Sequence, residues 1–281
     1  MAQPKNPMRS LFLRQIDFDE DPFTPAPDPR FIYLSNQHGP LLERLIGTID
    51  STIGMAIIDG ERGTGKSIVA RRLESYCACR PDSYIPVFIF NQVLDSEYAT
   101  LLAIADRLVL PRRKSLDAQF TEIKNFFRQQ AEEGRTIPII IDTNELISRE
   151  ALTQLSVIAT FSPVFIFSPP QILASLSKAA DILQQADRVK IGNLSLDDTV
   201  GMMQFRCSLA GRKTPLMEQD VLISIWESAF GNPGQIIKLC GRLLNMMQEK
   251  KIETASMNLI GLLFERSESE LELAQEALPI E

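Results

Sequence analysis

Five short apolar runs between residues 54 and 194 alternate with amphipathic helical patterns, and this alternation constrains the fold most. The runs are continuous and β-branched, which is typical of strands in a parallel sheet covered on both faces. They are residues 54–60, 84–91, 136–143, 162–168 and 187–194. Apolar residues at helical spacing predict helices at 66–78, 95–109, 116–133, 148–160 and 170–185. The pattern predicts an α/β domain: a parallel sheet with right-handed crossovers, sandwiched by helices.

The strand signal stops after about residue 194. Helical patterns then follow at 195–211, 217–229, 232–249 and 254–264, so we expect a small all-helical domain after the sheet. A further helical pattern precedes the sheet at 37–51. The predicted organisation is a proline-rich lead-in with a first helix (1–50), the α/β domain (51–194), the helical domain (195–264) and an acidic tail (265–281).

Residues 1–35 are rich in proline and include the stretch "DPFTPAPDPRFIYLS" at 21–35. Prolines at this density exclude helix and sheet interior. The segment nevertheless carries too many apolar groups for a solvated linker: Phe18, Phe23, Phe31, Ile32 and Tyr33. We therefore expect it to lie extended across the domain.

A glycine-rich loop lies between the first predicted strand and the helix at 66–78. Gly60-x4-Gly65-Lys66-Ser67, with Gly63 between, matches the phosphate-binding P-loop pattern in the required strand-to-helix context. Glycines allow backbone N–H groups to turn inward around an anion, and the helix N-terminus adds partial positive charge. The predicted nucleotide-binding residues are Gly60, Glu61, Arg62, Gly63, Thr64, Gly65, Lys66, Ser67 and Ile68. Lys66 is expected to reach the β- and γ-phosphates, and the Ser67 hydroxyl to bind Mg²⁺.

The strand "IPIIID" ends in Asp142, where a P-loop protein that uses Mg²⁺ needs an acidic residue. Asp142 is the predicted second metal ligand, and the alternative is a carboxylate that caps the next helix. P-loop ATPases of this general class usually carry Glu directly after that Asp, where it polarises the attacking water. Here that residue is Thr143, whose hydroxyl is a poor base at neutral pH, and Asn144 is also neutral. Glu145 is the nearest carboxylate and the candidate catalytic group.

Composition narrows the function classes. The net charge of −7 argues against a mainly nucleic-acid-binding surface. Cys77, Cys79, Cys207 and Cys240 form no C-x-x-C pair, and we expect reduced thiols of a cytosolic protein. One histidine, His38, excludes a multi-histidine metal site. The N-terminus shows no signal peptide and the apolar runs are only strand-length, so no membrane span is predicted.

From about Asp21 to Met247 the chain resembles the AAA+ ATPases of the ExeA/GspA type, the general secretion pathway A proteins, which are related to ATPases that regulate some bacterial DNA transposition systems. The stretches that carry the resemblance are "DPFTPAPDPRFIYLS", "IIDGERGTGKS", "IIIDTNELISREALTQL", "FSPPQILASL", "ADRVKIGNLSLDDTVGMMQFRCSLAG" and "GNPGQIIKLCGRLL". The resemblance implies a P-loop AAA+ domain followed by a helical lid domain. It implies assembly into a homo-oligomeric ring or filament. It also implies ATP as the nucleotide, and only the resemblance does so, because no base-reading motif stands out in the sequence.

The sequence departs from that family at two positions. The family's Asp-Glu-Ala-Gln is here Asp142-Thr143-Asn144-Glu145, and the arginine expected after Gly-x-Pro is here Gly234. Groups that read and cleave the γ-phosphate are therefore missing, while the residues that hold phosphate and metal remain. Arg188 matches a family arginine near the fifth strand. It acts either in trans on a neighbouring subunit's nucleotide or as an ordinary surface arginine.

Three functions compete at this point. The favoured one is a nucleotide-dependent oligomeric switch or scaffold that hydrolyses ATP slowly or not at all, with an unidentified protein partner. The second is an active ATPase of the secretion type that uses Glu145, with Lys66, Asp142 and Arg188 as the other catalytic candidates. The third is a DNA-binding ATPase, for which Arg71-Arg72 and Arg112-Arg113-Lys114 are either a DNA surface or solvated helix ends. Secretion-type relatives usually continue into a transmembrane segment and a peptidoglycan-binding domain. Neither follows here, so we expect a stand-alone cytosolic protein.

Overall fold

The computed structural model of the chain describes residues 7–24, 28–174 and 186–265. The chain divides into two compact units. The sheet unit is Asn36–Gly192, and the helical unit combines Met1–Ser35 with Asn193–Glu281. The predicted lead-in is thus split, because residues up to Ser35 group with the helical unit while the helix that follows them groups with the sheet.

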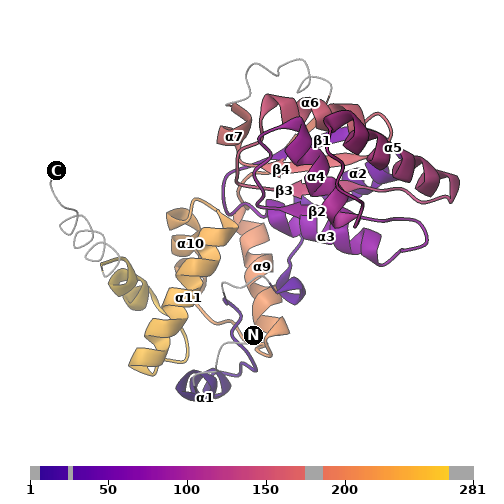
Figure 1. Cartoon of the computed structure of the whole chain (residues 1–281). Helices are drawn as coiled ribbons and strands as arrows, with labels where there is room; N and C mark the ends of the chain where they lie inside the picture. The colour runs from indigo at the N-terminus through magenta and orange to yellow at the C-terminus, as the bar shows by residue number, and fades with distance from the viewer. Residues whose placement is uncertain (1–6, 25–27, 175–185, 266–281) are drawn as a thin grey trace. The chain divides into compact units, whose positions relative to one another are not determined.

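The sheet unit contains five parallel strands in the order β2-β3-β4-β1-β5, of which Figure 1 labels β1 to β4. Their bounds are β1 Met55–Asp59, β2 Val87–Phe90, β3 Ile139–Asp142, β4 Val164–Ser168 and β5 Asp187–Lys190. All five predicted strands and the parallel α/β architecture are confirmed. Because β4 lies between β1 and β3, the carboxyl ends of these three strands meet at one edge of the sheet. Asp59 lies opposite Ser168 there, and Asp142 lies opposite Phe167.

Helices cover both faces of this sheet. Along β1, Ala56 and Ile58 pack against α2 and α3, whereas Met55 and Ile57 belong to the core under α4, α5 and α6. The bounds are α2 His38–Asp50, α3 Lys66–Ala78, α4 Glu97–Arg107, α5 Leu116–Glu132 and α6 Arg149–Ile158. Both faces of β1, which lies between β4 and β5, are therefore apolar, and this explains why its run did not alternate in the sequence.

Local chemistry starts these helices where the sequence predicts them. Ser96, Ser115 and Ser148 precede α4, α5 and α6, and each side chain accepts a hydrogen bond from the N–H three residues ahead. Such a cap satisfies one of the N–H groups left over at a helix start. The predicted helix at 170–185 begins as α7, Pro170–Ala174, and its remainder lies outside the described residues.

The helical unit has its own apolar core, and the predicted helices of this part of the chain are confirmed. They are α9 Leu196–Leu209, α10 Gln219–Ser228, α11 Pro233–Lys250 and a helix at 257–265. Before α11, Asn232 caps the helix by accepting from the N–H of Gln235, and Pro233 occupies the first turn, where no N–H is needed. The predicted tail lies outside the description from residue 266.

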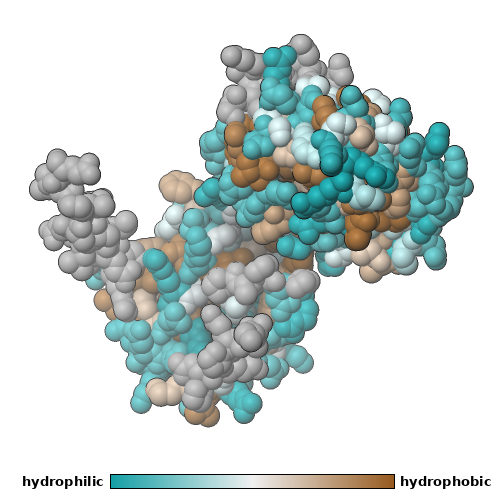
Figure 2. All heavy atoms as spheres, viewed as in Figure 1, coloured by the Kyte–Doolittle hydropathy of each residue, from teal (hydrophilic) through white to brown (hydrophobic). Residues whose placement is uncertain are grey.

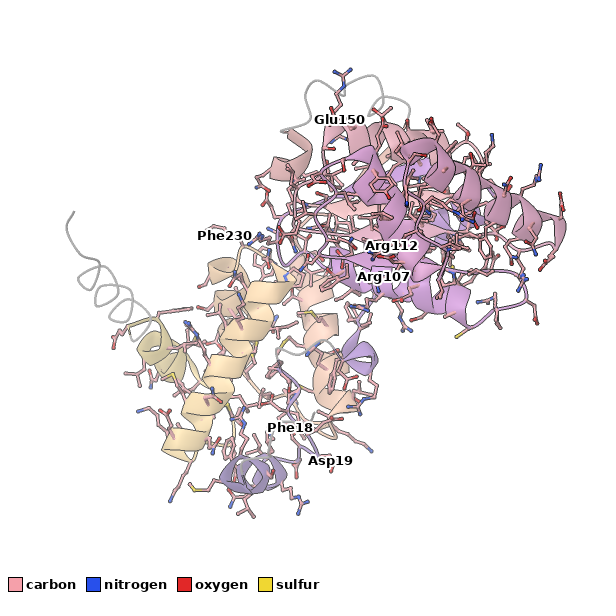
Figure 3. All side chains as sticks on the ribbon, viewed as in Figure 1. Phe18, Asp19, Arg107, Arg112, Glu150 and Phe230 are labelled. Carbon is pink, nitrogen blue, oxygen red and sulfur yellow. The ribbon has the colours of Figure 1, made fainter. Side chains whose placement is uncertain are left out.

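The lead-in packs into the core of the helical unit, and part of it is helical, contrary to the prediction. Helix α1, Pro7–Gln15, forms because its only proline is its first residue, where the missing N–H costs nothing. A short 3₁₀ turn, η1, covers Pro29–Phe31. Phe18, Phe23 and Phe31 are buried, so the apolar groups do serve a core. Figure 3 marks Phe18 and its neighbour Asp19, whose N–H donates to the carbonyl of Ala210 at 2.7 Å.

Two buried arginines hold the lead-in on this unit. Arg206 donates to the carbonyls of Pro22 and Phe31 at 2.7 and 3.0 Å, and its guanidinium lies 4.9 Å from the ring centroid of Phe31. Arg212 donates to the carbonyl of Ile16 at 2.8 Å and stacks over Phe18. Proline has no N–H to donate, and in this segment the arginine side chains supply the donors for the backbone carbonyls of Ile16, Pro22 and Phe31.

Across the described ranges, none of the helices has both the length and the apolar character needed to cross a membrane.

Candidate functional site

The glycine-rich loop connects β1 to α3 as the motif requires. Gly63 and Gly65 have φ angles of 88° and 99°, a region that glycine adopts freely. Gly65 is the N-cap of α3, and Lys66 is the first residue of that helix. Glu61, Arg62 and Gly63 are exposed, Thr64 is buried and Ile68 is half-buried. The predicted nucleotide-binding residues therefore form one loop at a helix N-terminus, the usual geometry of an anion site.

Lys66 is folded into its own loop. Its ammonium group donates to the carbonyl oxygens of Gly60 and Glu61 at 2.5 and 2.9 Å, and the residue is only 7% exposed. Burial lowers the pKa of Lys66, and the charges of Asp142, Glu61 and Asp59 oppose that shift. A phosphate oxygen would offer this ammonium a charged acceptor in place of two neutral carbonyls, and charge-assisted hydrogen bonds are stronger.

Ser67 and Asp142, the predicted metal ligands, contact each other. The Ser67 hydroxyl donates to Oδ1 of Asp142 at 3.1 Å. Asp142 is 3% exposed, and its Oδ2 is buried without a hydrogen-bond partner among the described residues. Burial raises the pKa of Asp142, although the Ser67 hydrogen bond and the charges of Lys66 and Arg71 lower it in part. An orphaned carboxylate oxygen beside a hydroxyl is the hard-oxygen donor set that Mg²⁺ takes together with nucleotide phosphates, so these residues fit the ion.

Among the residues that the structure describes, there is no group of three or more His, Cys, Asp or Glu side chains that could hold a metal ion. None of the four cysteines is in a disulfide; Cys77, Cys207 and Cys240 are buried and Cys79 is exposed.

The residues after Asp142 form a tight turn. Thr143 is buried, and its hydroxyl accepts a hydrogen bond from the N–H of Glu145 at 2.9 Å. The N–H of Asn144 donates to the Asn91 side chain at 3.1 Å, which ties this turn to the end of β2. Glu145 is exposed, three residues beyond the end of β3.

His38 is a contact that the sequence did not reveal. This buried histidine begins α2, and its Nε2 lies 3.0 Å from the carbonyl oxygen of Thr64. A carbonyl only accepts, so this nitrogen carries the hydrogen. A Cβ at Gly65 would come within 2.5 Å of the same nitrogen. The imidazole thus packs against the loop directly before Lys66. Only its position at the start of a helix could have suggested a role.

Arg188 has a partner within its own chain. Its guanidinium donates to Oδ2 of Asp59, the residue before Gly60, at 2.9 Å. Of the four predicted catalytic candidates, Lys66 and Asp142 are buried, whereas Glu145 and Arg188 are exposed. Ser168, the polar residue at the end of β4, is fully buried. Gly234 lies in the first turn of α11, in the helical unit.

Comparison with known proteins gives one curated relative. General secretion pathway protein A from Aeromonas hydrophila is 25% identical over 247 residues, which cover 83% of this chain and 44% of that protein. The chain thus spans less than half the length of this relative. No protein-family model matches the chain.

Several solved structures share the fold. The Aeropyrum pernix ORC1 protein in complex with DNA has a TM-score of 0.64 at 14% identity, over 93% of this chain and 73% of that one. The Aeropyrum pernix ORC2 protein, in ADPNP–ADP complexes, has a TM-score of 0.58 at 15% identity, over 83% and 70%. Domain III of the replication initiation protein DnaA from Thermotoga maritima has a TM-score of 0.52 at 13% identity, over 86% and 97%. The predicted AAA+ P-loop fold and the resemblance to the GspA-type ATPases are confirmed.

Proposed function

We propose, from the AAA+ fold and the similarity to general secretion pathway protein A, that this chain binds ATP–Mg²⁺ and hydrolyses it very slowly. In this proposal it acts as a nucleotide-dependent oligomeric switch or scaffold for a protein partner. Lys66 and the loop N–H groups hold the phosphates, and Ser67 and Asp142 hold the metal ion. Bound Mg²⁺ supplies charge neutralisation between the phosphates.

The turn at Thr143 is the observation that supports very slow ATP hydrolysis. A group that polarises water must present a free acceptor toward the nucleotide. The Thr143 hydroxyl already accepts from the N–H of Glu145, and an alcohol is a weak base at neutral pH. Glu145 itself is exposed, beyond the end of β3. The catalytic step therefore has no obvious base, while phosphate and metal ligands are intact.

Adenine nucleotide is supported by the structural neighbours. One of them, the Aeropyrum pernix ORC2 protein, was solved in ADPNP–ADP complexes. For this chain the nucleotide remains part of the proposal, because its own sequence shows no base-reading motif.

A binding surface near the site supports the switch. Three large apolar side chains, at the end of β2 and in the segments after β2 and β3, are about half exposed: Phe90, Val93 and Leu146. The backbone joins them to the site, since the N–H of Asn91 donates to the Asp142 carbonyl and that of Leu94 to the Leu146 carbonyl, at 2.9 and 3.0 Å. Figure 2 shows hydrophobic residues reaching the surface of both units among hydrophilic ones. Such patches are candidates for contact between subunits or with a partner.

The DNA-binding alternative has less support on this surface. Arg112, near Arg107 in Figure 3, forms an ion pair with Asp106, and Arg113 forms one with Glu122. Arg71 lies over the rings of Phe88 and Phe90. Arg112 and Arg113 are thus each paired with a carboxylate of this chain, although the neighbour ORC1 was solved in complex with DNA. A steep loss of DNA binding with salt would support this alternative.

The test restores the missing carboxylate with Thr143→Glu. General-base or water-positioning groups contribute on the order of 10²–10⁴ in rate, so phosphate release should rise at least about tenfold. Thr143→Gln is the control, because it has similar size without a carboxylate. Adding Gly234→Arg should increase the rate further if the γ-phosphate contact is also missing.

Oligomeric state, measured by light scattering with and without ATP–Mg²⁺, tests the switch on the same samples. Fast hydrolysis by the unmodified chain, lost on Glu145→Gln, would contradict the proposal and make Glu145 the catalytic residue. If the molecular mass from light scattering stayed the same when nucleotide was bound, the proposed nucleotide-dependent oligomeric switch would be wrong.

A further inference from the structure

We infer that Arg188 is a positioning residue of its own chain: it neutralises Asp59, the carboxylate directly before the phosphate loop, and so permits a triphosphate to bind. The inference rests on the proposed nucleotide binding and assigns Arg188 to the site in cis. It does not need a neighbouring subunit.

Asp59 occupies a position where a negative charge opposes the proposed ligand. It is the last residue of β1, and Gly60 follows it at the start of the loop. Its charge reaches Lys66, since it is one of the carboxylates that raise the pKa of that lysine. A nucleotide triphosphate would bring several further negative charges to the same lysine. The negative charges of Asp59 and of the phosphates would repel each other unless a cation lies between them or beside them.

The Asp59 side chain is also short of partners. It is 15% exposed, and Oδ1 is buried without a hydrogen-bond partner among the described residues, whereas Oδ2 receives the Arg188 guanidinium. Loss of Arg188 would leave a largely buried carboxylate without its hydrogen-bonded ion pair. A buried charge left in this way is strongly unfavourable.

The pairing follows from strand register. In the parallel pair β1 and β5, Ile57 lies opposite Arg188 and Asp59 lies opposite Lys190. The Arg188 side chain therefore extends along the strands to Asp59, which lies two residues beyond its opposite residue, Ile57. Lys190 is exposed on the same edge strand and provides a matched control, because it carries the same charge without that ion pair.

The experiment is a double-mutant cycle of Arg188→Ala and Asp59→Asn, read as the affinity for a non-hydrolysable ATP analogue with Mg²⁺ by calorimetry. Arg188→Ala should weaken binding by about tenfold or more, since a carboxylate charge then lies uncompensated near the phosphates. Asp59→Asn should bind at least as tightly as the parent chain. The double variant should recover the parent affinity, because the charge that Arg188 neutralises is gone. Arg188→Lys and Lys190→Ala should both stay near the parent affinity.

Thermal unfolding without nucleotide separates this from a loss of fold, and Arg188→Ala should remain folded since its side chain is half exposed. An equal loss of affinity with and without Asp59→Asn would overturn the inference and favour action in trans. Equal losses for Arg188→Ala and Lys190→Ala would overturn it too, because general surface charge would then explain the effect. If the unmodified chain bound no nucleotide, the proposed function would fail and this inference with it. If it bound nucleotide without rescue, this inference alone would fail.

Discussion

The sheet unit and the helical unit both bury charged side chains, and their surroundings differ. In the sheet unit, Lys66 and Asp142 lie at the carboxyl edge of the strands, and Asp142 keeps one buried oxygen without a partner among the described residues. In the helical unit, Arg206 and Arg212 lie under the lead-in. Their donors are directed at backbone carbonyls, and their guanidinium groups lie over aromatic rings.

This difference separates a site from a structural support. Buried polar groups are almost always hydrogen-bonded, so an unsatisfied one in a loop or at a strand end calls for an explanation. At Asp142 a bound cation is the simplest explanation, whereas the arginines are already satisfied by the fold. Variants in the two units should therefore affect different measurements: ligand binding in one and the free energy of unfolding in the other.

The largest effect is expected for Lys66→Ala. It removes the one side-chain cation directed at the phosphates in a loop otherwise made of backbone donors, so nucleotide affinity should be lost. The free energy of unfolding without nucleotide should change little, because the loss of the hydrogen bonds to the Gly60 and Glu61 carbonyls is offset by removal of a buried ammonium group. Calorimetric titration and urea unfolding of the same preparation measure both quantities. Equal affinity in the variant and the parent chain would disprove the P-loop assignment.

The reverse result is expected for Arg206→Ala. Two buried carbonyls lose their donor and the Phe31 ring loses its stacked guanidinium, so the unfolding free energy should fall by about 2–4 kcal/mol. Nucleotide affinity should stay near that of the parent chain. Arg14→Ala is the matched control, because Arg14 is exposed on α1. A large loss of nucleotide affinity without a fall in the unfolding free energy would contradict the assignment of Arg206 as a structural residue.

The same contrast explains what the sequence could predict. Apolar periodicity and the glycine-rich motif are local, and they predicted the strands, the helices and the loop at Gly60–Ser67. The contacts of His38 with Thr64, of Arg188 with Asp59 and of Arg206 with Pro22 join residues far apart in the chain. No local pattern encodes such pairs. The helix at α1 was missed because proline content was averaged over a segment in which the prolines lie mainly outside that helix.

Asp142 should link metal binding to pH. Because burial raises its pKa, the folded state holds this proton more tightly than the unfolded chain does. The group thus contributes stability below the ordinary aspartate pKa, and that contribution is lost as pH rises through the raised value. Mg²⁺ needs the ionised form, so metal affinity should fall as pH drops. Asp142→Asn should raise the apo unfolding temperature at neutral pH and abolish the gain in nucleotide affinity that Mg²⁺ gives. A less stable apo variant would show that the carboxylate is structural.

The buried thiols allow the two units to be compared in a single experiment, with the smallest expected effect. Cys79 is exposed and should react first with a thiol reagent, so Cys79→Ser leaves Cys77 as the reporter of the sheet unit. Cys207 and Cys240 report on the helical unit. Burial raises the pKa of Cys77 to about 12 and that of Cys207 to about 11, so these thiols react only when their surroundings open.

ATP–Mg²⁺ at ten times its Kd should slow labelling of Cys77 by about tenfold, since the ligand stabilises the closed form. Labelling of Cys207 and Cys240, followed by mass spectrometry, should change less if the units open independently. Equal slowing at all three thiols would show that the two units open together, and nucleotide binding would then stabilise the helical unit as much as the sheet.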